Sequence, residues 1–176
     1  MEEKIKSNLI FKGKVIQVYH DEVKCSNGVL ANREVVRHLG GAAILFINSK
    51  KEVLLIKQFR YAFNEELYEI PAGKLEVSED PMLAAKRELE EETGYHTNNI
   101  KPLGIIYPTV GYSDEKIYLY LVEEATLEST HFDIDEDITS AFYPLKDVLE
   151  MIQNGSIKDA KTICAIHYYL NLKGAN

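Results

Sequence analysis

The chain has 176 residues, of which 45% are hydrophobic and 27% charged, as is usual for a soluble domain with its own core. Its 20 basic and 28 acidic residues give a net charge of 20 − 28 = −8, which argues against a nucleic-acid partner. No run of about 18 apolar residues is present and the first residues do not resemble a signal peptide, so we expect a cytoplasmic protein without a membrane partner.

The sequence pattern mixes strands and helices without strict alternation. Residues 9–25 are rich in β-forming residues, and the turn at 26–28 predicts a hairpin with residues 29–38. Further apolar or β-forming runs predict strands at 42–47, 53–59, 68–70, 100–107, 116–123 and 141–144. Helices are expected from residue 81 onward and at 145–153 and 159–172. This order indicates a layered α+β domain.

The helix expected from residue 81 has clear start and stop signals. Asp80 is suited to cap its N-terminus, and Pro81 fits the first helical position. Gly94 can end the helix in the left-handed conformation. The apolar residues at helical spacing are Met82, Ala85 and Leu89. We therefore expect this stripe to face the core.

Acidic residues crowd one face of this helix. The three carboxylates on that face, spaced by three and four positions, are those of Glu88, Glu91 and Glu92. Glu90 points elsewhere, Glu79 can approach from the preceding loop, and Arg87 can pair with the carboxylate four residues later. Oxygen ligands gathered without Cys or His are typical of Mg²⁺, with Mn²⁺ as an alternative. Such a metal commonly also binds substrate phosphates.

Residues 73–95 fit the pattern G-x5-E-x7-R-E-U-x-E-E-x-G-U, in which U is a bulky apolar residue. The matching residues are Gly73, Glu79, Arg87, Glu88, Leu89, Glu91, Glu92, Gly94 and Tyr95. This stretch resembles the signature of the Nudix hydrolases, with Tyr95 where the family usually has a branched aliphatic residue. The resemblance implies the α+β Nudix fold, a mixed β-sheet sandwiched between α-helices. Gly73 is expected to let the backbone approach a ligand closely.

Four further segments resemble the Nudix subgroup that cleaves ADP-ribose, namely residues 33–36, 57–60, 68–73 and 155–162. The resemblance implies two parts: an N-terminal β extension at residues 1–38 and a Nudix hydrolase domain at 39–176. In the subgroup the extension forms a homodimer, often by exchange; folding back onto its own chain is the alternative. Val110 stands where the subgroup has a marker proline, which leaves the preferred nucleotide sugar open.

The resemblance also implies metal ligands and catalytic groups. Two or three Mg²⁺ ions would be held by Glu88 and Glu92, with Glu91 and the carbonyl of Ala72 assisting. Arg87 and Glu91 would take part in catalysis. The general base would come from the acidic loop at residues 133–137, where we choose Glu136; another acid of this loop or of the motif is the alternative.

Residues outside the motif are expected to bind the substrate. Arg60 and Arg33 are candidates for the diphosphate, because the guanidinium fork matches phosphate oxygens. Glu69 belongs to the segment that resembles the subgroup's Glu-Leu-Pro-Ala-Gly, and Tyr19 is placed to stack on adenine. A surface arginine or a tyrosine packed in the core is the alternative for each position.

Taken together, these features predict metal-dependent hydrolysis of the diphosphate bond of a nucleoside diphosphate sugar. ADP-ribose, cleaved to AMP and ribose 5-phosphate, is the first expectation. GDP-mannose, another sugar nucleotide or a dinucleoside polyphosphate is the alternative substrate. A non-catalytic Nudix module that binds a ligand is the alternative of a different class, and the full set of motif carboxylates argues against it.

Overall fold

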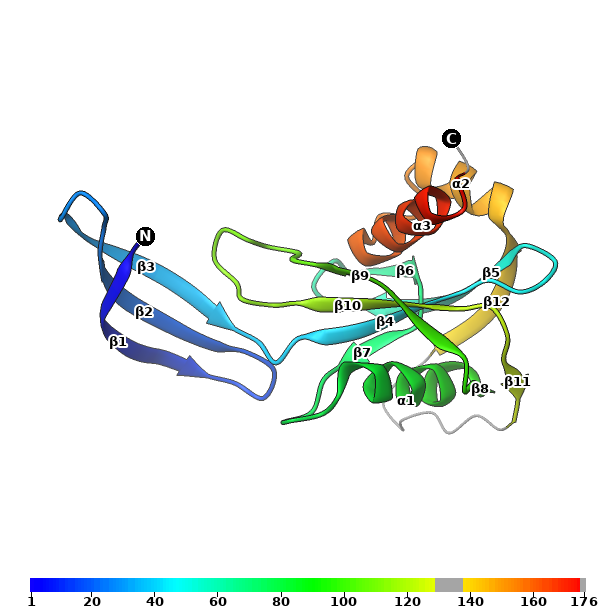
Figure 1. Cartoon of the computed structure of the whole chain (residues 1–176), viewed down its shortest axis with the longest axis horizontal. Coiled ribbons are helices and arrows are strands. Elements are labelled where there is room, and N and C mark those ends of the chain that lie inside the picture. The colour runs from blue at the N-terminus through cyan, green and yellow to red at the C-terminus, as the bar shows by residue number, and fades with distance from the viewer. Residues whose placement is uncertain (129–137, 175–176) are drawn as a thin grey trace. The chain divides into compact units, whose positions relative to one another are not determined.

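The computed structural model describes residues 1–128 and 138–174, and its internal contacts divide the chain into two compact units (Figure 1). One unit comprises Met1–Gly40 and Tyr107–Lys116, and the other comprises Gly41–Ile106 and Ile117–Asn176. The first unit therefore contains the expected N-terminal extension together with the distant loop that carries Val110.

The first unit is a three-stranded antiparallel sheet in the order β1-β2-β3. Its strands are β1 (Glu3–Lys12), β2 (Gln17–Lys24) and β3 (Leu30–Arg37). The expectation of a two-stranded hairpin with one continuous segment at 9–25 was wrong. The backbone N–H of Gly13 donates to the carbonyl of Ile16 at 2.9 Å, and this turn separates β1 from β2. The second turn, predicted correctly, has Gly28 at φ 84°, a conformation that favours glycine.

The loop of the first unit is held against β3 by backbone and side-chain bonds. Val36 N–H donates to the carbonyl of Tyr112 at 2.7 Å, and Asp114 N–H donates to the carbonyl of Val36 at 3.1 Å. Arg37 Nη1 donates to Asp114 Oδ2 at 3.1 Å. The loop that contains Val110 is thus hydrogen-bonded to β3 of the N-terminal sheet. The sequence alone did not indicate this contact.

The second unit contains two larger sheets, in the strand orders β7-β4-β10-β9 and β12-β5-β6. The strands of the first are β4 (Gly41–Phe46), β7 (Ala72–Lys74), β9 (Ile100–Ile106) and β10 (Ile117–Val122). Those of the second are β5 (Glu52–Arg60), β6 (Glu65–Glu69) and β12 (Ile138–Pro144). A short pair is formed by β8 (Tyr95–His96) and β11 (Thr126–Leu127). β4 and β10 run parallel while the other pairs are antiparallel, so the expected mixed sheet is confirmed, although it is split in two.

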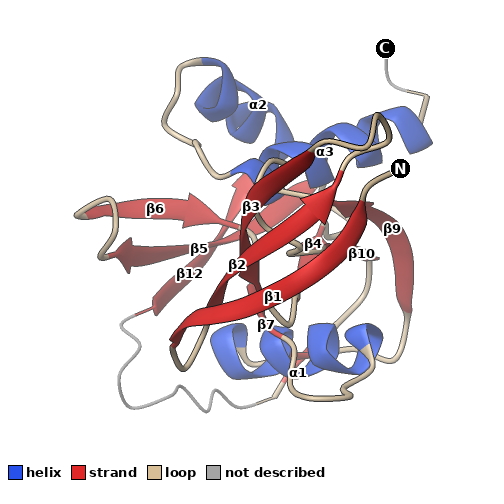
Figure 2. Ribbon diagram, turned by 90° about the vertical axis from the view of Figure 1, so that its left-hand side faces the viewer, coloured by secondary structure: helices blue, strands red, loops and turns tan. Residues whose placement is uncertain are grey.

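Helices cover the strands of the second unit from both sides, with α1 on one side and α2 and α3 on the other (Figure 2). They are α1 (Pro81–Thr93), α2 (Leu145–Gln153) and α3 (Ala160–Leu172). Successive residues of β4 alternate between the two layers: Ala43 and Leu45 join the core cluster of α2 and α3, whereas Ala42 and Ile44 join that of α1. Among the helices of the described residues, none has the length and apolarity needed to cross a membrane.

The ends of α1 follow the sequence signals. The Asp80 carboxylate accepts hydrogen bonds from the N–H groups of Met82 (2.9 Å) and Leu83 (3.2 Å), as an N-cap does. Gly94 has φ 73° and donates its N–H to the carbonyl of Glu90 at 2.8 Å. Ala85 and Leu89 of the predicted apolar stripe are buried. The neighbouring polar face of α1 therefore lies at the edge of the core.

Candidate active site

Arg87 is the centre of the carboxylate cluster on α1. Its Nε donates to Glu79 Oε1 at 3.0 Å, and its Nη1 donates to Glu88 Oε1 at 2.7 Å and to Glu91 Oε2 at 2.9 Å. The hydrogen bond with Glu79 raises the pKa of Arg87 above its ordinary value and lowers the pKa of Glu79. One guanidinium therefore holds three carboxylates in place, which confirms the predicted contact with Glu91 and the approach of Glu79.

Glu92 links α1 to β7. Its side chain is almost completely buried, and its Oε2 accepts the backbone N–H of Ala72 at 3.0 Å. The structure thus brings two of the four predicted metal-ligating residues, Ala72 and Glu92, into direct contact. A carboxylate buried to this degree needs compensation by hydrogen bonds or positive charge. The N–H of Ala72 supplies one such bond.

Gly73, the residue after Ala72, makes room for a side chain of the cluster. A Cβ added at Gly73 would lie 1.9 Å from both Cδ and Oε1 of Glu88, far inside contact distance. The side chain that lies against this backbone is the Glu88 carboxylate, and the expected close approach of a ligand stays a prediction. Glycine at this position allows the carboxylate to lie directly against β7.

The composition of the cluster fits a hard divalent cation. Its carboxylates belong to Glu79, Glu88, Glu91 and Glu92; Arg87 pairs with the first three, and Arg60 interacts electrostatically with Glu92. The donors are oxygen atoms, the type that Mg²⁺ and Mn²⁺ prefer. Excess negative charge at short range is unfavourable unless a cation balances it. The residues present therefore suit the metal that this kind of motif implies.

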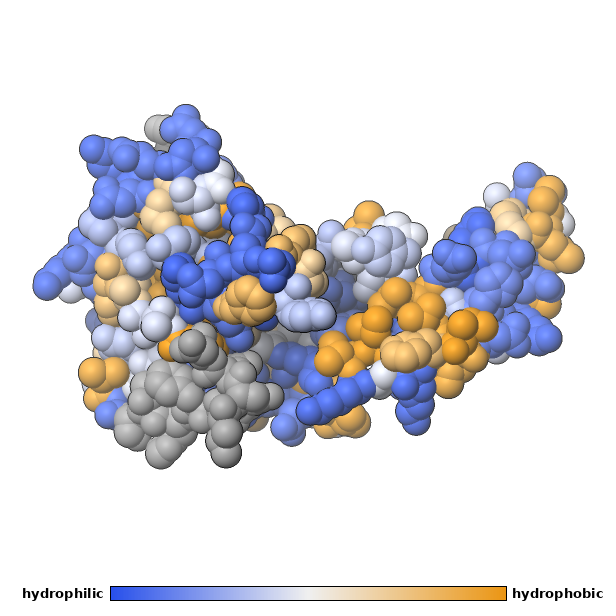
Figure 3. All heavy atoms as spheres, turned by 180° about the vertical axis from the view of Figure 1, so that it is seen from behind, coloured by the Kyte–Doolittle hydropathy of each residue, from blue (hydrophilic) through white to orange (hydrophobic). Residues whose placement is uncertain are grey.

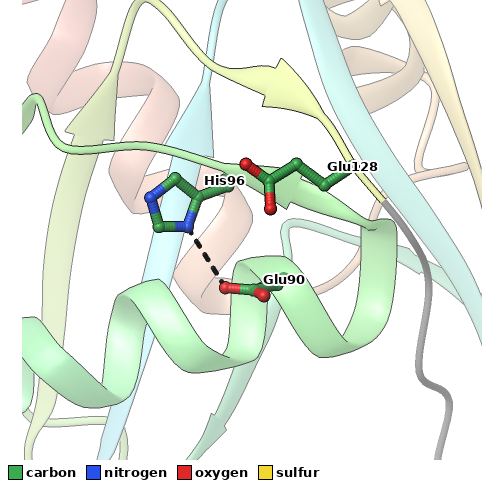
Figure 4. A group of neighbouring side chains, drawn as sticks. All are labelled: Glu90, His96 and Glu128. Carbon is green, nitrogen blue, oxygen red and sulfur yellow. Dashed lines mark hydrogen bonds and ion pairs between the residues drawn. The ribbon is translucent and has the colours of Figure 1, made fainter.

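The remaining acid of the helix, Glu90, lies outside this cluster, as predicted. Its Oε2 lies 3.3 Å from Nδ1 of His96, and Glu128 lies beside the pair (Figure 4). The side chains of Glu90 and His96 are 42% and 37% exposed, so this is a surface contact of a kind that usually contributes little to stability. Glu90 is thus a natural reference position for variants of the cluster.

A second charged group connects β5 and β6, two strands of one sheet, to α3. Arg60 makes a two-pronged pair with Glu69, from Nε to Oε1 at 2.6 Å and from Nη2 to Oε2 at 2.7 Å. Lys161 Nζ also donates to Glu69 Oε2. Burial alone would raise the pKa of Glu69, but the hydrogen bonds and charges of Arg60 and Lys161 outweigh it and hold that pKa below its ordinary value.

Lys161 was absent from the residues singled out in the sequence. The sequence feature that could have pointed to Lys161 is the segment 155–162, which resembles the ADP-ribose-cleaving subgroup. No local pattern in that segment assigns a role to this lysine. The predicted substrate residues Arg60 and Glu69 are brought together by the structure. Glu136, the chosen general base, lies outside the described residues.

Arg33 and Tyr19 belong to the first unit. Arg33 is exposed and pairs with Glu2, to which its Nε donates at 3.1 Å. The Tyr19 hydroxyl donates to Gln17 Oε1 at 2.9 Å. Tyr19 also lines an open pocket of about 550 Å³ whose other lining residues are Ile10, Val18, His20, Glu34, Val35, Val36 and Tyr112. The surroundings of Tyr19 are mostly apolar, with Glu34 and His20 among them, while Arg33 is paired with Glu2.

The NUDIX domain family model matches residues 37–166 of the chain, a range that contains the carboxylate cluster, Arg60 and Glu69. The fold and the carboxylate cluster on α1 are those expected of a Nudix protein. The chain belongs to the NUDIX domain family. The metal dependence of Nudix hydrolases, on divalent cations, agrees with the oxygen donors of the cluster.

Among curated proteins, an ADP-ribose pyrophosphatase of Bacillus subtilis is 39% identical over 178 aligned positions, covering 99% of this chain and 96% of that protein. A methanol dehydrogenase activator of Bacillus methanolicus is 36% identical, covering 95% and 91%. A GDP-mannose pyrophosphatase of Escherichia coli is 36% identical, covering 77% and 76%. A crystal structure of an ADP compounds hydrolase superposes with a TM-score of 0.84, at 19% identity, covering 99% and 97%, and shows the same fold.

Proposed function

We propose that this protein hydrolyses the diphosphate bond of a nucleoside diphosphate sugar with a divalent cation, Mg²⁺ or alternatively Mn²⁺. ADP-ribose is the proposed main substrate, with AMP and ribose 5-phosphate as products. The observation that carries the proposal is the Arg87-centred carboxylate cluster, present in a chain 39% identical to an ADP-ribose pyrophosphatase. GDP-mannose is the alternative, since a pyrophosphatase for it is also a relative.

In the proposed mechanism the carboxylates of Glu88 and Glu92, with Glu91 and the Ala72 carbonyl, hold the cation. When bound, the cation would polarise the diphosphate and lower the pKa of bound water. Arg87 keeps the carboxylates oriented, so little rearrangement is needed during the reaction. Glu136 is proposed to accept the proton of the attacking water.

Substrate contacts are proposed for Arg60 and Glu69 in the second unit and for Arg33 and Tyr19 in the first. Both arginines are held by carboxylates and present planar guanidinium groups suited to phosphate oxygens. The apolar pocket beside Tyr19 supports stacking of a planar base such as adenine.

The proposed activity is tested by product release from ADP-ribose, GDP-mannose, UDP-glucose, NADH and diadenosine polyphosphates with Mg²⁺, with and without EDTA. We expect kcat/KM for ADP-ribose to exceed that for the others by about tenfold or more, and EDTA to stop turnover. Val110→Pro serves as a matched variant, because Val110 is exposed and stands where the ADP-ribose-cleaving subgroup has its marker proline. Turnover that persists in excess EDTA would contradict the metal assignment.

A homodimer is also proposed, through the sheet of the first unit. All ten residues of β1 are exposed, among them Leu9, Ile10 and Phe11, and all residues of this unit are described and none is helical. Figure 3 shows apolar side chains gathered on this sheet. The exposed apolar side chains of β1 form a patch of the kind that marks an interaction surface, and a second copy of the chain is the proposed partner. The cytoplasmic location and the absence of nucleic-acid and membrane partners stay predictions from the sequence.

Sedimentation of the purified protein tests the dimer. We expect a mass of about 40 kDa, twice the 20.0 kDa of the chain, and a shift toward one chain in Ile10→Glu, since a charge would be buried without a partner. Val77→Glu, an equally drastic change at an exposed residue of the second unit, is the control. A single-chain mass for the unchanged protein would contradict the proposal.

A second candidate function is regulation of another enzyme. The observation that favours it is a relative named methanol dehydrogenase activator, which is 36% identical over 95% of this chain. The substrate panel separates the two: binding of a nucleotide sugar without turnover would favour a regulatory module. Turnover that depends on the carboxylate cluster would favour the enzyme.

A further inference from the structure

The first turn of α3 is organised around one capping carboxylate. Asp159 Oδ2 accepts the backbone N–H of Thr162 at 2.9 Å and its hydroxyl at 2.5 Å. Asp159 Oδ1 lies 3.0 Å from Lys161 Nζ. A cap that bound only the backbone would leave both side chains free to point elsewhere. Here the same carboxylate fixes the directions of the lysine and the threonine.

Both side chains reach the end of β6, about ninety residues earlier in the chain. Lys161 Nζ donates to Glu69 Oε2, and the Thr162 hydroxyl oxygen accepts the backbone N–H of Ile70 at 2.8 Å. Thr162 is completely buried and Lys161 nearly so. A buried ammonium group is unfavourable unless it is paired, and this one is paired with two carboxylates. The turn therefore fixes two consecutive residues of the β6 end.

The fixed residues lead directly into the carboxylate cluster. The carbonyl of Pro71 accepts the N–H of Ile44 at 2.8 Å, and Ala72 N–H donates to Glu92. Glu69 in turn holds the plane of the Arg60 guanidinium through its two-pronged pair. Residues 69 to 72 are thus tied one after another to α3, β4 and α1.

We propose that Asp159, Lys161 and Thr162 form a positioning element that orients the pair Arg60–Glu69 toward the diphosphate of the substrate. The proposal rests on the function proposed above. Lys161 Nζ and Arg60 Nη2 donate to the same oxygen, Glu69 Oε2, while Arg60 Nε donates to Oε1. With Lys161 in place the carboxylate keeps one orientation, and its two-pronged pair orients the guanidinium in turn. None of the three residues needs to touch the substrate. Their role is to restrict the conformations of the Arg60 side chain before the substrate arrives. Less side-chain entropy is then lost on binding.

The test compares Lys161→Met with Lys158→Met. Lys158 belongs to the same segment and pairs with Glu65 at 2.9 Å, at the other end of β6, but it is exposed. Lys161→Met should raise KM for ADP-ribose by about tenfold or more and change kcat by less than about threefold, because a less ordered Arg60 weakens binding of the ground state and the transition state alike. Lys158→Met should leave both unchanged, and Lys161→Arg should restore most of the affinity.

A second variant keeps the test decisive where Lys161→Met does not fold. Thr162→Val keeps the volume but removes the hydroxyl that binds Ile70 N–H, and Thr162→Ser keeps it. Thr162→Val should raise KM while Thr162→Ser does not, with circular dichroism confirming the fold of each. Unchanged KM in both Lys161→Met and Thr162→Val would overturn the proposal.

Binding of ADP-ribose by calorimetry in metal-free buffer separates this proposal from the proposed function. If the unchanged protein neither turns over nor binds the nucleotide sugar, the proposed function fails. If it binds and turns over ADP-ribose but the variants bind equally well, only the positioning role fails. A weaker binding constant in the variants, in proportion to KM, supports the role.

Discussion

A Glu92→Gln variant is expected to remain folded and to lose about 10³-fold or more in kcat/KM, because one of the buried charges proposed to hold the cation is removed. The amide oxygen of glutamine can still accept the N–H of Ala72, which Glu92 binds at 3.0 Å in the structure. The link between α1 and β7 should therefore survive, while the negative charge disappears. Steady-state kinetics at increasing Mg²⁺ concentration, with thermal unfolding, measure the two effects separately.

Glu90→Gln is the matched control for this prediction. Glu90 lies two positions earlier on the same helix, and its carboxylate pairs with His96 at the surface instead of joining the Arg87 cluster (Figure 4). The same chemical change there should alter kcat/KM by less than about twofold, as expected for an exposed pair. Near-normal activity in folded Glu92→Gln would remove Glu92 from the proposed ligands. Equal losses in both variants would point to a general effect of helix charge.

The parts of the site that the sequence predicted are those set by local geometry. The limits of α1 follow from Asp80, Pro81 and Gly94, which lie within one residue of its ends. The contact between Arg87 and Glu91 follows from the four-residue spacing of a helix. The helix at 145–153 was placed correctly for the same reason, since its apolar periodicity is contained within the segment.

The parts that the sequence did not predict depend on which distant segments meet. Nothing near Glu69 in the chain indicates that Lys161 will pair with it, because this contact is made only when the first turn of α3 comes beside the end of β6. The bridge between Val36 and Ser113, which attaches the loop of the first unit to β3, is of the same kind. The turn at Gly13 was missed because the residues on both of its sides are β-formers. Composition cannot show where such a run reverses its direction.

Gly73→Ala is expected to leave the fold intact and to reduce kcat/KM by about 10²-fold or more, because it displaces a proposed ligand by steric contact. The new methyl group would lie 1.9 Å from Cδ and Oε1 of Glu88 and 2.2 Å from Oε2. These atoms are the end of a flexible side chain, so the carboxylate can move away at little cost to stability. In doing so it leaves its position against β7 and its hydrogen bond with Arg87 Nη1.

Comparison with Glu88→Gln shows what this displacement means. Glu88→Gln removes the charge but keeps the shape of the side chain, whereas Gly73→Ala keeps the charge and moves it. Both should raise the Mg²⁺ concentration for half-maximal activity by about tenfold or more, as expected when metal ligands lose charge or alignment. Gly111→Ala, where an added Cβ meets no atom within 4 Å, should leave that concentration unchanged. Normal metal dependence in Gly73→Ala would show that the carboxylate of Glu88 acts from another position than the one it occupies here, and that the glycine serves a different purpose.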